Sequence, residues 1–157
     1  MKRVSVARPV FGLVLPDMVK GPWSDIVLGI RQTAQKDGHG VCVPLCWDDP
    51  AAVLRHPSAF ARLCAEAGID GVFLRAFPDR KDTRRVLSAL RREKIPVVLL
   101  RINDESPIGG AGVDVVTLRR EGRVPSLLAA QLGSVACHAL LRRLANPSNP
   151  PADLVLE

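Results

Sequence analysis

The sequence contains no tyrosine, only two tryptophans and four phenylalanines. It also has no apolar run near the roughly 20 residues that a membrane-spanning helix needs. With so few aromatic rings, the chain has few side chains on which the bases of a single-stranded nucleic acid could stack. The basic start, Met1 to Arg3, is followed by a short run that Arg8 and Pro9 break, which is not the pattern of a secretory signal. We therefore expect a cytoplasmic protein without a membrane segment.

Motifs for catalysis and nucleotide binding are missing as well. The first loop lacks both GxGxxG and GxxxxGK[ST], the glycine patterns that cradle phosphates. His39, His56 and His138 are scattered, without HExxH or paired carboxylates, and Ser24 and Ser106 lack a nucleophile elbow. We expect no cofactor, no metal ion and no enzymatic activity.

The four cysteines form no CxxC pair. If residues 41–46 form a strand, Cys42 and Cys46 lie on one face, about 13 Å apart. That separation is too large for a disulfide or a shared metal ion. We interpret these cysteines, together with Cys64 and Cys137, as small buried thiols in a reducing compartment.

The formal net charge is +6. Such a balance is compatible with nucleic-acid binding or with a solvated, arginine-rich surface. The positive charges are spread over several helices without a lysine-rich block, which favours the solvated surface. No recognition helix is evident, so we expect no direct DNA binding by this chain.

Short apolar runs alternate with amphipathic segments along 157 residues, a length that suits one domain. Proline at position 57 interrupts the helix that Asp48, Asp49 and Pro50 start, and Ser58 is expected to cap its continuation. The predicted strands cover 10–15, 41–45, 69–74, 95–100, 113–118 and 154–156, and the predicted helices cover 23–36, 48–56, 58–67, 79–94 and 125–144.

This alternation predicts an α/β fold, a doubly wound parallel sheet of flavodoxin-like topology with strand order 2-1-3-4-5. The run 95–100 is apolar almost throughout, as expected of a strand buried on both faces. We divide the chain into a flexible lead (1–9), a single α/β domain (10–145) and a proline-rich tail with a short strand (146–157).

Four segments in register resemble the effector-binding domain of LacI/GalR-type transcription regulators, relatives of periplasmic sugar-binding proteins. They are 12–17 (GLVLPD), 25–30 (DIVLGI), 68–72 (GIDGV) and 95–99 (IPVVL). That domain has two lobes with the ligand between them, and this chain has room for about one. The resemblance implies that the second lobe is largely deleted and that the helix-turn-helix is absent, since nine residues precede the first strand.

The resemblance also implies a ligand site at the carboxyl edge of the sheet, in the first strand–helix loop. Trp23 falls where the family stacks an aromatic ring on its sugar, or it packs as structural filler. Asp17 and Lys20 lie beside it, Lys20 at a position where the family often has asparagine. Asp48 follows the second strand at the same edge and points into the cleft, while Asp49 is expected to cap the next helix.

Three arginines, Arg75, Arg101 and Arg119, follow successive strands and are expected at that edge. Three guanidinium groups there favour a phosphate or a carboxylate, unless they face solvent or pair with Asp79, Asp104 or Asp114. The family commonly has an aspartate where Arg101 stands, which argues against a neutral sugar.

We therefore expect a non-enzymatic effector-binding domain for a sugar, a sugar phosphate or another small anion. The alternative is an interaction module that has lost ligand binding and only dimerises. The last helix carries a wide apolar stripe, either because all of it is core or because one side meets a second copy in a homodimer.

Overall fold

The computed structural model describes residues 8–15, 21–38, 40–45, 51–103 and 112–157. Six parallel strands form one sheet in the order β2-β1-β3-β4-β5-β6. The strands are β1 (Val10–Val14), β2 (Val41–Pro44), β3 (Gly71–Arg75), β4 (Val97–Ile102), β5 (Asp114–Leu118) and β6 (Asp153–Leu156). The α/β class, the parallel sheet and the predicted order 2-1-3-4-5 are confirmed, and β6 adds to β5 at the far edge.

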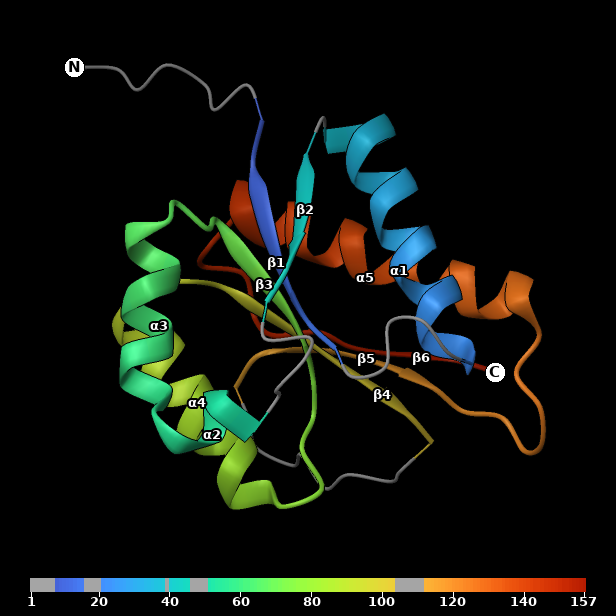
Figure 1. Cartoon of the computed structure of the whole chain (residues 1–157). Helices are drawn as coiled ribbons and strands as arrows, with labels where there is room; N and C mark the ends of the chain where they lie inside the picture. Colours follow the sequence, from blue (N-terminus) through green and yellow to red (C-terminus); the bar gives the residue numbers. More distant parts are fainter. Residues whose placement is uncertain (1–7, 16–20, 39, 46–50, 104–111) are drawn as a thin grey trace.

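Helices cover both faces of the sheet (Figure 1). One face carries α1 (Gly21–Thr33), which continues as the π-helical turn η1 (Ala34–Gly38), and the long helix α5 (Ser126–Ala145). The other face carries α2 (Ala51–Arg55), α3 (Pro57–Glu66) and α4 (Arg80–Arg92). None of these helices is long and apolar enough to cross a bilayer, over the residues that the structure describes.

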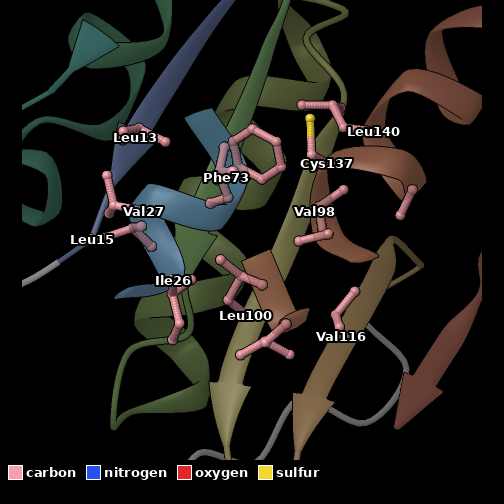
Figure 2. Packing of buried hydrophobic residues seen from close by; sticks show 14 of the residues in the cluster. Leu13, Leu15, Ile26, Val27, Phe73, Val98, Leu100, Val116, Cys137 and Leu140 are labelled. Carbon is pink, nitrogen blue, oxygen red and sulfur yellow. The ribbon is translucent and has the colours of Figure 1, made fainter. Parts of the chain in front are cut away.

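Two hydrophobic clusters hold the three layers together, one on each face of the sheet. Successive strand residues point to opposite faces, so Phe73 joins the α1/α5 cluster while Val72 and Leu74 join the other. Figure 2 shows the α1/α5 cluster, in which Phe73 lies among side chains from β1, α1, β4 and α5. The same alternation of side chains along a strand determines on which face of the sheet the residues at the strand ends lie.

The interruption at Pro57 is confirmed, but Ser58 is not the cap. The N-cap of α3 is His56 and Pro57 is its first residue, with no side-chain hydrogen bond at the cap. Proline suits that position because its missing N–H would have no helical partner there. The strands β3 and β4 also begin two residues later than predicted and end with Arg75 and Ile102.

Helices α1 and α5 pack backbone to backbone. A Cβ placed on Gly29 would overlap the carbonyl oxygen of Ala130, and one placed on Gly133 would overlap that of Ile26. The hydroxyl of Thr33 donates to Ser134 Oγ at 2.9 Å across the same contact. The wide apolar stripe of α5 is therefore largely occupied within the chain, by the sheet on one side and α1 on the other.

Burial raises the pKa of two cysteine thiols on this face. The pKa of Cys42 rises to about 11, because burial outweighs the opposing effect of Arg31. The pKa of Cys137 rises to about 12, through burial and, to a smaller extent, Cys42 and Asp37. Cys42 is half-buried, Cys64 and Cys137 are buried, and Cys46 lies outside the described residues.

We expect Cys42 and Cys137 to resist alkylation in the folded protein. Since the thiolate is the reactive form, the raised pKa of Cys42 leaves only a very small reactive fraction at neutral pH. Iodoacetamide labelling followed by peptide mass spectrometry should show slow modification of both in buffer and fast modification in urea. Equal rates for Cys42 under the two conditions would contradict this environment.

Candidate functional site

The carboxyl ends of the parallel strands form one edge of the sheet, where the ligands of such folds bind. β3 ends at Arg75, β4 carries Arg101 one residue before its end, and Arg119 directly follows β5. The structure thus brings the three predicted arginines to this edge. Asp17, Lys20 and Asp48 lie outside the described residues, so their roles remain predictions.

Trp23 lies in the first turn of α1, and only 6% of it is exposed. Arg75 shares a strand face with Phe73, two residues earlier, and this face looks toward α1. The Arg75 guanidinium carbon lies 4.9 Å from the centre of the Trp23 ring, a cation–π contact. The guanidinium therefore covers a face of the ring, and Trp23 supports Arg75 rather than offering an open stacking surface.

Arg101 lies on the opposite face of the sheet. Its neighbour Leu100 belongs to the α1/α5 cluster, whereas Leu99 belongs to the cluster under α4. Arg101 follows the parity of Leu99, and its Nε donates to Thr117 Oγ1 at 2.9 Å. Thr117 is the register partner of Arg101 on β5 and is fully buried. Its hydroxyl therefore holds the Nε of the Arg101 guanidinium in place.

Arg119 is exposed just beyond β5. Its backbone N–H donates to the carbonyl of Leu156 at 2.8 Å, which extends the β5–β6 pairing. Its guanidinium lies 3.9 Å from the carboxylate of Glu157. The three arginines thus share an edge but have different partners, and Arg75 and Arg101 lie on opposite faces of the sheet.

The sequence left open that these arginines pair with Asp79, Asp104 or Asp114. The structure gives Asp79 and Asp114 other partners. Asp79 is the N-cap of α4 and accepts a hydrogen bond from the backbone N–H of Lys81 at 2.8 Å. Asp114 pairs with Arg143 at the other end of its strand. Asp104 lies outside the described residues.

Sequence reasoning missed a turn that shapes this edge. Asn103 follows β4 in a left-handed conformation with φ of 54° and donates its N–H to the Leu118 carbonyl at 2.6 Å. Its side-chain oxygen accepts a hydrogen bond from the Arg120 N–H at 2.8 Å. Asparagine tolerates positive φ better than most residues, and this tolerance was the available signal.

His138 is paired with an acidic side chain, and His39 lies outside the described residues. His138 Nε2 lies 2.7 Å from the carboxylate of Asp37, which joins α5 to η1 at the surface. In the part of the chain that the structure describes, no three histidine, cysteine or acidic side chains are grouped to hold a metal ion.

No protein-family model matches the sequence, and no curated protein sequence matches it. The fold does match solved structures. A LacI transcriptional regulator from Lactobacillus brevis aligns at a TM-score of 0.59 and 10% identity, over 95% of this chain and 97% of that chain. An ABC transporter solute-binding protein from Burkholderia graminis, in complex with D-arabinose, aligns at 0.60 and 10% identity, over 100% of this chain and 95% of that chain.

The chain therefore has the fold of LacI-type regulators and ABC solute-binding proteins. The resemblance predicted from four sequence segments is confirmed at the level of the fold. At these identities the likeness defines the architecture, and function is argued from the site.

Proposed function

We propose that this chain is a non-enzymatic binding domain for a small phosphorylated effector, such as a sugar phosphate, held at the carboxyl edge of the sheet. The observation that carries the proposal is the Arg75 guanidinium, fixed on the buried ring of Trp23 at the end of β3. A guanidinium already held by a ring loses less freedom when it binds an anion.

The guanidinium favours an anionic ligand. Its planar donors match the oxygens of a phosphate or carboxylate, with which it forms charge-assisted hydrogen bonds. The D-arabinose bound by the Burkholderia graminis protein of this fold supports a sugar as the rest of the ligand. Ligand binding is proposed to shift the association state of the domain.

We expect D-ribose 5-phosphate to stabilise the protein in a saturable way and Arg75→Gln to remove most of that effect. A charge-assisted hydrogen bond contributes roughly 1.5 to 3 kcal/mol, so the variant should bind about 10 to 100 times more weakly. Thermal shift and calorimetric titration measure this. At 100 times the dissociation constant, the wild type should gain about 2.7 kcal/mol.

The control is Arg31→Gln, which removes the same charge from an exposed position on α1. It should bind like the wild type. D-ribose without phosphate tests the anion requirement. No saturable binding, or equal binding by Arg75→Gln and the wild type, would refute the phosphate site.

A second candidate is a module that only associates with itself. Val41 and Val43 on β2 are 44% and 36% exposed, and Val155 on β6 is 42% exposed. These are the outer strands, which in the described sheet pair on one side only. Sedimentation analysis of Val43→Lys distinguishes the candidates: this module predicts a dimer that the lysine dissociates and no saturable ligand.

A further inference from the structure

The described residues form a basic cavity between α3 and α4, which lie side by side on one face of the sheet (Figure 1). Its volume is about 310 Å³, at the lower end of the range of roughly 300 to 1,000 Å³ that small-molecule sites have. The charged residues that line it are all arginines of α4. The full lining is Arg84, Arg85 and Arg92 with Ser58, Ser88 and Pro57.

The helical repeat places this lining on one stripe of α4. Arg84 and Arg92 are eight residues apart with Ser88 midway, so the three positions fall within about a quarter turn of the helix. All three are exposed. The opposite stripe carries Val86 and Leu90, which are fully buried in the core. The basic side chains are therefore not used for packing and are available at the cavity.

The charge at this cavity is only partly compensated. Arg85 Nη1 lies 3.7 Å from Asp82 in an exposed and therefore weak ion pair. Among the described residues, the ion pairs involve neither Arg84 nor Arg92, and Glu93, which follows Arg92, does not line the cavity. Three guanidinium groups less one carboxylate leave two net positive charges. Like charges gathered in this way repel each other, and an anion held between them removes the repulsion.

Hydroxyl groups and the start of α3 add hydrogen-bond donors to this charge. Ser88 lies between the arginines on α4, and Ser58 is the second residue of α3. No side chain caps the first turn of α3, whose N-cap is His56. The N–H groups and the dipole of a helix start favour phosphate oxygens, which accept hydrogen bonds. The serines and the helix start thus reinforce the preference that the guanidinium groups set.

We propose that this cavity binds a short polyphosphate and recognises it through its phosphate groups alone. Guanidinium groups keep their charge at physiological pH and match phosphate oxygens in planar pairs. Since Arg84 and Arg92 are about 12 Å apart along the helix axis, a chain of phosphates contacts both in place, whereas a single phosphate must draw one toward the other. The lining has no aromatic ring on which a base would stack.

The site is separate from the effector site proposed above. Trp23 belongs to the core cluster under α1 and α5, and Arg75 lies on its ring. Helices α3 and α4 cover the other face of the sheet. Binding at the two sites is therefore tested by different variants, and each proposal fails independently of the other.

The test is a titration of the full ¹⁵N-labelled chain with tripolyphosphate, followed by NMR and by calorimetry. We expect saturable shifts at the amides of Ser58, Arg85 and Ser88. The double variant Arg84→Gln/Arg92→Gln should lose roughly tenfold or more in affinity, as expected when charge-assisted hydrogen bonds are removed. Inorganic phosphate should bind more weakly than tripolyphosphate by a similar factor. ATP carries the same number of phosphates and should bind about as tightly as tripolyphosphate.

Arg31→Gln/Lys36→Gln is the matched control, since it removes two positive charges from exposed positions of α1 and η1 on the other side of the sheet. It should bind tripolyphosphate like the wild type, as should Arg75→Gln at the carboxyl edge. The spectrum of each variant without ligand reports whether it is folded, and the shifts of the wild type locate the site without any variant.

Four results would overturn the proposal. They are the absence of saturable binding, shifts at the carboxyl edge in place of α3 and α4, an equal loss of affinity in the control and the test variant, and much tighter binding of ATP than of tripolyphosphate.

Discussion

Gly133→Ala is expected to lower the free energy of unfolding by about 3 kcal/mol, at the upper end of the usual cost of overpacking. The added methyl group would overlap the Ile26 carbonyl oxygen and lie 2.8 Å from Ile30 N. These atoms belong to the α1 backbone, so no side-chain rotation relieves the overlap and the helices must separate. That separation would disturb the core that Figure 2 shows between α1, α5 and the sheet.

Urea unfolding and thermal melting measure this effect, with a drop in melting temperature of roughly 6 to 12 °C for a chain of this size. Gln131→Ala, at an exposed position two residues away on α5, is the control and should change little. Alanine favours a helix over glycine by about 1 kcal/mol. A Gly133→Ala protein more stable than the wild type would therefore show that the helices are not in backbone contact.

Arg143→Met is expected to cost about 3 to 5 kcal/mol, because it leaves a buried carboxylate without its cation. Arg143 Nε and Nη2 each donate to an Asp114 oxygen at 3.0 Å, and Asp114 is 5% exposed. The same guanidinium holds the carbonyls of Pro147, Asn149 and Pro150. Its loss should therefore also loosen the turn and the pairing of β6, which hydrogen exchange at β6 amides would detect.

Arg85→Met provides the control for a surface pair. Arg85 lies 3.7 Å from Asp82, and its side chain is 55% exposed. Such exposed pairs contribute roughly 0 to 1 kcal/mol, so this variant should unfold almost like the wild type. In a double-mutant cycle, Arg143→Met and Asp114→Asn should be clearly non-additive. Additive losses would mean that the two side chains do not act as a pair.

The Asp114 pair also predicts a pH dependence. Burial acts to raise the pKa of Asp114, but the hydrogen bonds from Arg143 and the Ala152 N–H outweigh it, so the pKa falls below its usual 3.8. The unfolded chain then binds this proton at higher pH than the folded one. The contribution of Asp114 to stability is therefore complete well above pH 3.8 and is lost as the pH falls below it. Asp114→Asn should flatten this acid limb in unfolding curves.

The fold was largely predictable because each local signal agreed with the next. The continuous apolar run that became β4 indicated a strand buried on both faces, and the glycine and proline punctuation separated it from the helices. The predicted sixth strand was confirmed as β6, in parallel register with β5. The boundaries were less accurate, as at Pro57, because a helix start depends on which residue satisfies the first N–H groups.

The candidate site was predictable only in part. The sequence placed Arg75 and Arg101 at one edge, since both end neighbouring parallel strands. It did not indicate that Arg75 would lie on Trp23, or that Arg101 would bond Thr117 on the other face. A shift of one residue in the pairing of two strands moves every side chain of one strand to the opposite face of the sheet. Strand boundaries that are wrong by one or two residues therefore do not show which face Arg75 and Arg101 take.

The sequence by itself determined the layered α/β architecture, because hydrophobic periodicity and turn residues act within short stretches of chain. Only the tertiary structure decided the glycine contact between α1 and α5, the Asp114–Arg143 pair and the cavity between α3 and α4. Each joins residues from segments far apart in the chain: Ile26 and Gly133, Asp114 and Arg143, Ser58 and Arg92. Such contacts arise from the packing of whole elements, which leaves no periodic trace in either segment.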